Sequence, residues 1–128
     1  MRVVKVSEAV GPVLDWMVAK CDFDAPTVEG GVVHAAQDYM PFQPSADWAH
    51  GGPIIEREIT KLFKNVGGTY TAQIKREIPI RLEDRGTSLA THYIDWLNVA
   101  GHTPLIAAMR CYVASKLGEE VEVPDGIT

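Results

Sequence analysis

The clearest pattern in the chain is a stretch near its C-terminal end in which apolar side chains recur with helical spacing. Between Thr103 and Gly118, the i, i+4, i+7 positions are occupied by Leu105, Met109, Tyr112, Val113 and Lys116. Thr103 can accept a hydrogen bond from a free backbone N–H, and proline is favoured at the next position, where it loses no hydrogen bond. Gly118 can adopt the left-handed conformation that ends a helix. The pattern therefore predicts a helix with one buried face.

A second helix is predicted near the N-terminus. It begins at Gly11 and Pro12, and one stripe of it carries Leu14, Met17, Val18 and Cys21. Before it, residues 2–6 alternate in the manner of a short strand. After the C-terminal helix, the acidic segment up to Pro124 is predicted to be an edge strand or ordered coil.

The middle of the chain has the period of two that is typical of strands. Residues 54–64 and 69–80 flank Gly67 and Gly68, which supply positive φ, so the region predicts a β-hairpin. In the second arm Tyr70, Ala72 and Ile74 alternate with polar residues. Pro79 removes a ladder donor and favours an edge strand or a bend there. Residues 87–100 fit either a helix or a strand, and we favour a strand or an irregular segment.

Between these elements lies a stretch, residues 22–53, that is rich in proline and glycine. Continuous helix or central strand is excluded there, so the pattern predicts a long ordered loop at about 22–53. With 128 residues, the chain has the size of one ordinary domain. We therefore expect a single α+β domain over residues 1–128, with a small, mainly antiparallel sheet and two principal helices packed on one side.

Composition narrows the function classes. Hydrophobic residues make up 46% and charged residues 23% of the chain, which is typical of a globular protein. No apolar run is long enough to cross a membrane, and the N-terminus does not resemble a signal peptide. The two cysteines, Cys21 and Cys111, fit buried reduced thiols better than a disulfide. We expect a cytoplasmic protein without a membrane partner.

Charge is distributed unevenly. The formal net charge is −5, which argues against a nucleic-acid-coating protein. Residues 57–85 nevertheless carry seven basic and four acidic side chains, a local balance of +3. Because only Phe63 and Tyr70 lie among these charges, aromatic interleaving is weak, and a solvated sheet surface is favoured over a phosphate-binding patch. Nucleic acid is therefore an unlikely partner, and weak binding through the 57–85 hairpin stays an alternative.

The candidate site is the segment Pro44–Glu58, which brings acidic, aromatic, histidine and basic side chains together within a short stretch. Asp47 offers an acceptor, Trp48 a flat apolar surface, and His50 a group that titrates near neutral pH. Gly51 and Gly52 would let the backbone approach a ligand closely. The predicted ligand- or partner-binding residues are Tyr39, Asp47, Trp48, His50, Gly51, Gly52, Glu56 and Arg57.

Two other interpretations of this segment are open. In the structural one, Trp48 caps the core, Gly51-Gly52-Pro53 forms the turn into the hairpin, and the charges are solvated. In the enzymatic one, His50 or Glu56 acts as general acid or base beside Gly51-Gly52, and Arg57 steadies an anionic substrate. As strand residues, Glu56 and Glu58 would share a face without forming a close pair.

Common cofactor and metal signatures are missing from the sequence. The paired glycines are not followed by a phosphate-binding GKS or GKT sequence, and Gly30-Gly31 is not a dinucleotide fingerprint. The four histidines lack the short spacing of a zinc site, and Asp22-Phe23-Asp24 lacks the rest of a calcium loop. We expect neither a metal nor a cofactor.

Three segments carry a resemblance to a known family: LDWMVAKC, DWAHGGPIIERE and TPLIAAMRCYVASKLGEEVEVP. In this order and wording they resemble the NinX-type phage accessory proteins, a family without an agreed activity. The stretches 24–40 and 80–102 look less like the family. The resemblance implies a phage or prophage origin and the cytoplasm of a bacterial host. Our leading hypothesis is an accessory protein that binds a host protein or small ligand through the 39–57 surface. We favour this hypothesis over an enzyme. Pairing of two chains along an exposed hairpin edge is an open alternative.

Overall fold

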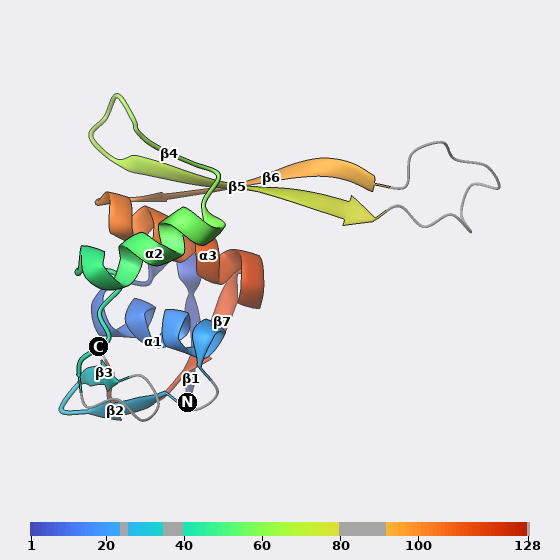
Figure 1. The fold of residues 1–128 in the computed structure, drawn as a ribbon. Helices are drawn as coiled ribbons and strands as arrows, with labels where there is room; N and C mark the ends of the chain where they lie inside the picture. The colour runs from blue at the N-terminus through green and yellow to red at the C-terminus, as the bar shows by residue number, and fades with distance from the viewer. Residues whose placement is uncertain (24–25, 35–39, 80–91, 128) are drawn as a thin grey trace.

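The structure, a computed structural model, describes residues 1–23, 26–34, 40–79 and 92–127 (Figure 1). The helices of this part of the chain are η1 (Val6–Glu8), α1 (Gly11–Asp22), α2 (Trp48–Glu58) and α3 (Pro104–Leu117). The strands are β1 (Arg2–Lys5), β2 (Thr27–Glu29), β3 (Val32–His34), β4 (Lys61–Lys64), β5 (Tyr70–Pro79), β6 (His92–Gly101) and β7 (Glu120–Val123). All pairs are antiparallel, in sheets β1-β7, β2-β3 and β4-β5-β6. The predicted α+β class is confirmed.

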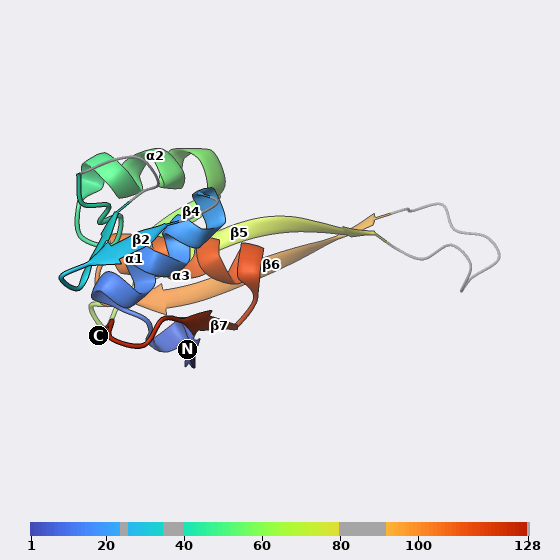
Figure 2. The ribbon, with the colours of Figure 1, turned by 90° about the horizontal axis from the view of Figure 1, so that it is seen from below.

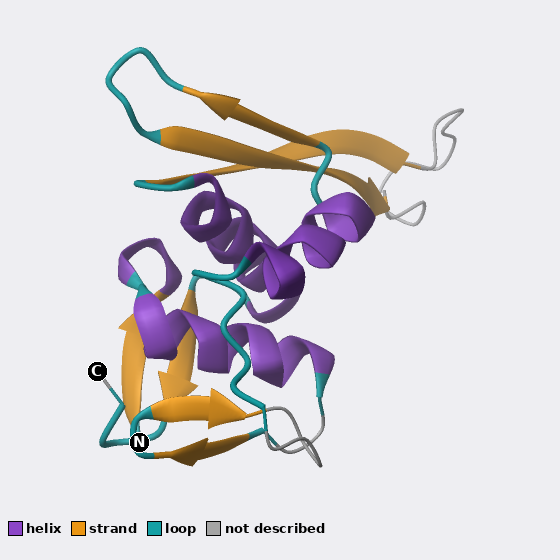
Figure 3. Cartoon of the chain, turned by 60° about the vertical axis from the view of Figure 1, so that its left-hand side comes forward, coloured by secondary structure: helices purple, strands orange, loops and turns teal. Residues whose placement is uncertain are grey.

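Helix α3 occupies the centre of the molecule, between the three-stranded sheet and α1 (Figure 3). It begins and ends as predicted: the Thr103 hydroxyl accepts from the Ile106 N–H at 3.1 Å, and Gly118 has a φ of 91°. Almost every side chain in its first two and a half turns is buried, because α1, α2, β5 and β6 all pack against it. The prediction of a single buried face is therefore wrong for this part of α3, which is buried around most of its circumference.

Helix α1 and the β1-β7 sheet form the lower part of the molecule in Figure 1. Leu14, Met17 and Val18 of the predicted stripe are completely buried. Strand β1 pairs with β7 from Arg2↔Val123 to Lys5↔Glu120, so the two ends of the chain lie side by side. The predicted N-terminal strand is confirmed, and the acidic tail is a strand.

The predicted hairpin is confirmed over β4 and β5, but its first arm is shorter than expected. Residues 54–58 belong to helix α2 and not to a strand. Strand β5 is the central strand of its sheet, and its inward face carries Ala72, which lies opposite Leu62 and Val99. Pro79 is the last residue of β5 and pairs with His92. The favoured strand at 87–100 is confirmed from His92 onward, and residues 87–91 lie outside the described part. Figure 2 shows that the ribbon formed by β5 and β6 extends well beyond the helices.

The predicted loop at 22–53 is interrupted by regular structure. Gly30 and Gly31 have positive φ and close the short β2-β3 hairpin, and an isolated bridge joins His34 to Pro41. Helix α2 begins at Trp48, so Gly51 and Gly52 lie in a helix and do not form the predicted turn. The physical reason is that Asp47 caps this helix and Ile54 is buried on its inner face. This third helix was not predicted.

Both cysteines are free, as expected, and burial makes them poor nucleophiles. Burial raises the pKa of the Cys21 thiol to about 12 and that of the Cys111 thiol to about 11. We therefore expect both thiols of the folded protein to react with a thiol reagent such as DTNB at pH 8 much more slowly than in denaturant, Cys111 the more slowly because it is completely buried. Kinetics of the Cys21→Ser and Cys111→Ser variants assign the two rates. Rapid labelling of Cys111 in the folded protein would contradict this.

Candidate functional site

The predicted 39–57 surface is built on helix α2 and the segment before it. Asp47 caps the helix, and its carboxylate accepts from the Ala49 N–H at 2.9 Å. Trp48, at the first helical position, is 56% exposed. Tyr39 lies outside the described residues. Asp47 and Trp48 thus lie at the N-terminal end of α2.

His50 is engaged in local packing. Its Nδ1 accepts from the Gln43 N–H at 3.0 Å, and its ring stacks on Phe42 with 5.6 Å between ring centroids. Phe42 in turn packs edge-on against Phe23. Because an accepting Nδ1 carries no proton, the neutral ring holds its proton on Nε2. His50 therefore fastens the segment before α2 onto the helix.

The structure separates the other predicted residues of α2. Gly51 is buried against Pro44 and Leu105, whereas a Cβ on Gly52 would meet only Trp48, at 4.0 Å. Glu56 is exposed six residues after His50, which places it about 9 Å further along the helix and on a different face. Glu56 and Glu58 do not share a face either, because they lie on a helix and not on a strand. His50 and Glu56 are not brought together as an acid–base pair.

Arg57 belongs to a polar cluster where the C-terminal ends of α1 and α2 meet α3. Its guanidinium lies 2.9 Å from Glu58, 3.4 Å from Asp22 and 3.3 Å from the Tyr112 hydroxyl. The Tyr112 hydroxyl donates to Asp22, and Lys116 lies 3.6 Å from Glu58. Burial, with the Asp22 contact, raises the pKa of Tyr112. Every member of the cluster has an ion-pair or hydrogen-bond partner within it, so the cluster holds the three helices together.

Asp15 is a buried carboxylate that sequence reasoning did not single out. It is 4% exposed, and its Oδ1 accepts from the Ser45 N–H at 2.8 Å, which fixes the chain before α2 to α1. Burial raises its pKa above the usual 3.8, although the bonds from Ser45 oppose this. The charged form is thus less favoured in the folded than in the unfolded chain.

The raised pKa of Asp15 predicts a pH effect. The folded protein binds more protons than the unfolded one, so this group lowers stability as the pH rises from 3.8 through the raised folded pKa. We therefore compare the free energies of unfolding of Asp15→Asn and the wild type. Over this pH range, the value for the variant should rise relative to that for the wild type. Above the range, the difference between the two should stay constant. Urea unfolding of both proteins from about pH 4 to pH 7 measures this. Parallel profiles would contradict the assignment.

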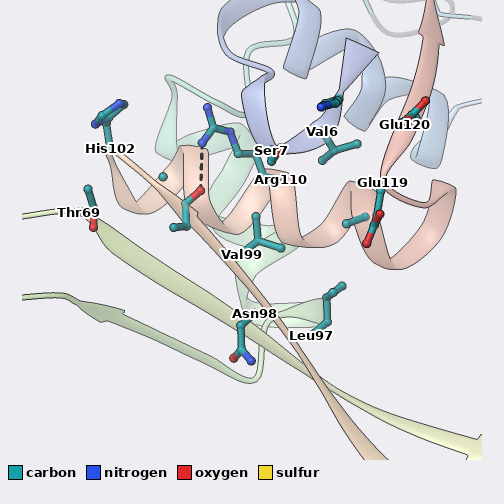
Figure 4. A pocket seen from close by; sticks show the side chains of 14 residues that line it. Val6, Ser7, Thr69, Leu97, Asn98, Val99, His102, Arg110, Glu119 and Glu120 are labelled. Carbon is teal, nitrogen blue, oxygen red and sulfur yellow. Dashed lines mark hydrogen bonds between the residues drawn. The ribbon is translucent and has the colours of Figure 1, made fainter. Parts of the chain in front are cut away.

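A pocket of about 620 Å³ lies on the opposite side of α3, between η1, the C-terminal end of β6 and the start of β7 (Figure 4). Val6, Leu97 and Val99 contribute apolar surface. The polar lining comes from Lys5, Ser7, Thr69, Asn98, His102, Arg110, Glu119 and Glu120. None of these residues belongs to the predicted 39–57 surface.

Arg110 is the most unusual residue of this pocket. It is 8% exposed, its Nε donates to the Ala9 carbonyl at 2.9 Å, and its Nη1 donates to the Ala100 carbonyl at 3.0 Å. No carboxylate of the described residues forms an ion pair with it. Burial lowers its pKa, but an arginine starts high enough to remain charged. The pocket therefore has a buried positive charge in its wall.

The charges of the pocket are arranged asymmetrically. Figure 4 shows His102 and Thr69 on the same side as the Arg110 guanidinium, while Glu119 and Glu120 lie at the far end. Sequence reasoning missed this site because its residues come from four distant segments. The only signal was an arginine in the middle of a buried helix.

Two further findings concern the described residues. They contain no group of three or more histidine, cysteine, aspartate or glutamate side chains placed to hold a metal ion. Among the described helices, none has the length and apolar character that a membrane span requires.

Comparison with known proteins gives the family of the chain. The family model described as "Bacteriophage P22, NinX" matches residues 5–116, which includes α1, α2, most of α3 and the residues of the pocket up to Arg110. The search of curated proteins finds no match. The matched range covers most of the chain, and the resemblance inferred from three sequence segments is confirmed. The chain belongs to the NinX family of phage proteins.

Proposed function

We propose that this phage protein binds a small anionic ligand, a carboxylate or a phosphate, in the pocket lined by Arg110. The observation that carries the proposal is a buried guanidinium that has no carboxylate partner among the described residues and faces an open cavity. A buried charge without a counter-ion is costly, and a bound anion would offset that cost. In this proposal, the ligand supplies the missing partner.

The geometry of the guanidinium supports the choice of an anion. Arginine has five N–H donors in a planar fork, and the contacts with Ala9 and Ala100 account for two of them. These two bonds fix the plane of the fork. A fixed fork is suited to paired bonds with a carboxylate or phosphate, and little side-chain entropy is lost on binding.

The remaining lining favours a small ligand over a large polyanion. The volume falls within the range of roughly 300–1,000 Å³ that is usual for small-molecule sites. Val6 and Val99 offer an apolar wall beside Arg110, while Glu119 and Glu120 would repel additional negative charge. The ligand that fits best has one anionic group and an apolar or cationic remainder.

The test is a titration with defined anions followed by ¹H–¹⁵N NMR. Inorganic phosphate, acetate, benzoate and a panel of amino acids serve as probes. We expect saturable shifts at residues 99–102 and at the Arg110 side-chain Nε–H for at least one probe. In Arg110→Lys, which keeps the charge but loses the fork, the affinity should fall about tenfold or more. Arg57→Lys is the matched control because Arg57 lies in the separate helix-junction cluster, and it should bind as the wild type does.

Two results would overturn the proposal. One is the absence of saturable shifts around Arg110 with every probe of the panel. The other is an equal loss of affinity in Arg110→Lys and Arg57→Lys, which would show an indirect effect on the fold. Circular dichroism of each variant separates a loss of binding from a loss of structure.

A second candidate function is binding of a host protein through the 39–57 surface. It is supported by the exposure of Trp48 at the start of α2, since tryptophan often dominates the energy of protein interfaces. No comparable arrangement supports acid–base catalysis by His50 and Glu56. Both binding functions would operate in the cytoplasm of the bacterial host, where thiols such as those of the two free cysteines stay reduced.

The second candidate is tested by affinity capture from host lysate with three proteins. The wild type and Trp96→Ala, which removes another exposed tryptophan, should retain the same host protein, and Trp48→Ala should lose it. Retention by Trp48→Ala would exclude this surface.

A further inference from the structure

The β4-β5-β6 sheet has one face packed on α3 and one face turned away from the helices (Figures 1 and 3). Cross-strand register defines the outward face, because Leu62, Ala72 and Val99 belong to the packed face. The alternate positions face outward. They are Lys61, Phe63, Thr71, Gln73, Lys75, Glu77, Ile94, Trp96, Asn98 and Ala100, which we call the outer sheet face.

Two aromatic side chains stand on this outer sheet face. Phe63 is 44% exposed and Trp96 is 40% exposed. Phe63 lies opposite Thr71 and Trp96 lies opposite Lys75, so their rows are four residues apart along β5, or roughly 13 Å. Exposed aromatic residues on a sheet, separated in this way, can each stack with one base of a single strand.

Amide side chains fill the row between the two aromatics. Gln73 and Asn98 are directly paired across β5 and β6 and lie on the same face, with Lys61 completing the row on β4. Their amide groups provide both donors and acceptors for the edges of bases. A base edge lying between the two stacked positions would thus meet polar groups.

Positive charge surrounds the aromatic residues although the whole chain is acidic. The Lys61 ammonium lies 5.4 Å from the centre of the Trp96 ring, and Lys75 is the direct cross-strand neighbour of Trp96. Lys64 follows Phe63 at the end of β4, and Glu77 is the acidic residue of the face. On the outer sheet face itself, Lys61 and Lys75 against Glu77 give a local charge of +1, compared with −5 for the chain. This local charge is complementary to a phosphate backbone.

We infer that the outer sheet face binds single-stranded nucleic acid, with Trp96 and Phe63 stacking bases and Lys61 and Lys75 contacting phosphates. The sequence alone argued against nucleic acid because aromatic residues are few in the basic segment 57–85, which contains Phe63 and Tyr70 but no tryptophan. The register supplies the missing tryptophan from β6, which lies outside that segment. A single strand is favoured over a duplex because stacking on a side chain requires bases that are free of their own neighbours.

The test uses a fluorescein-labelled dT₁₂ oligonucleotide and fluorescence anisotropy at about 20 mM salt, where phosphate contacts are strongest. We expect saturable binding by the wild type. Trp96→Ala should weaken it about tenfold or more, and Trp96→Phe should restore most of it, because a phenyl ring still stacks. Trp48→Ala, the matched control on α2, and Arg110→Lys, in the pocket, should bind as the wild type does.

The salt dependence of the affinity is a second measurement. It would not change if Trp96 had only a structural role. For a single strand, the logarithm of affinity falls by about 0.7 per neutralised phosphate for each tenfold rise in salt. Lys61→Ala combined with Lys75→Ala should therefore reduce the slope by about 1.4. An unlabelled duplex of the same length should compete at least tenfold more weakly than the single strand.

Several outcomes would overturn the inference. These are no binding of dT₁₂ at low salt, equal losses in Trp96→Ala and Trp48→Ala, and an unchanged salt slope in the double lysine variant. Self-association that Trp96→Ala abolishes, without oligonucleotide binding, would instead assign this face to a second copy of the chain. Loss of small-anion binding in the pocket would leave this inference unaffected, because Phe63, Trp96 and the two lysines of the outer sheet face do not line the pocket.

Discussion

Replacing Gly51 with alanine is expected to lower the free energy of unfolding by about 2 to 3 kcal/mol, as is typical for overpacking a tight core position. A Cβ at this position would lie 2.5 Å from the Pro44 carbonyl oxygen and 2.6 Å from Leu105 Cδ2. Leu105 could rotate, but the carbonyl belongs to the backbone that leads into α2. The helix would have to move away from α3 to make room.

Gly52 provides the matched control within the same helix. A Cβ there would meet only the Trp48 ring at 4.0 Å, and alanine favours a helix over glycine by about 1 kcal/mol. Gly52→Ala should therefore be neutral or stabilise slightly, and urea unfolding of both variants measures the difference. Equal stabilities for the two variants would show that α2 is not packed as tightly as the structure has it.

Replacing Arg110 with methionine is expected to cost about 3 kcal/mol or more, because hydrogen bonds from a charged group are worth roughly 1.5 to 3 kcal/mol each. The substitution keeps an unbranched apolar chain but removes the donors to the Ala9 and Ala100 carbonyls. These bonds join α3 to the segment between η1 and α1 and to the end of β6. Their loss would loosen two connections made by one side chain.

The control for this experiment is Arg57→Met, on the other side of α3. Arg57 is 51% exposed in its side chain, and exposed ion pairs contribute about 0 to 1 kcal/mol. Chemical unfolding should thus separate the two arginines by about 2 kcal/mol. If Arg110→Met were as stable as Arg57→Met, release of the buried positive charge would have outweighed the lost hydrogen bonds.

The parts of the fold that sequence predicts best are those in which local signals and tertiary packing agree. Helix α3 has a cap, a proline at its first position and a terminal glycine, and the structure uses all three. The β4-β5 hairpin was found from alternation and from Gly67-Gly68. Helix α2 was missed because Gly51, Gly52 and Pro53 are local signals for a turn. The Asp47 cap and the burial of Gly51 and Ile54 override them, and only tertiary contact reveals that.

The candidate sites also differ in whether local sequence or tertiary contact defines them. Sequence found the exposed Trp48 and its neighbours, because they lie within one short segment. It could not find the pocket, which depends on the meeting of η1, β6, α3 and β7, or the outer sheet face, which depends on the register between β5 and β6. His50 and Glu56, each proposed from sequence as a general acid or base, lie on different faces of α2, because the segment is a helix and not the expected loop and strand.

The pairing of β1 with β7 affects how the protein folds during its synthesis. Strand β1 is made long before its partner, which begins only at Glu120, so their contacts join segments far apart in the sequence. Helix α3, which forms the centre of the core, is also made long after β1. Completion of this sheet must therefore await the emergence of β7 from the ribosome, and β1 presents an open edge to other chains and to chaperones until then.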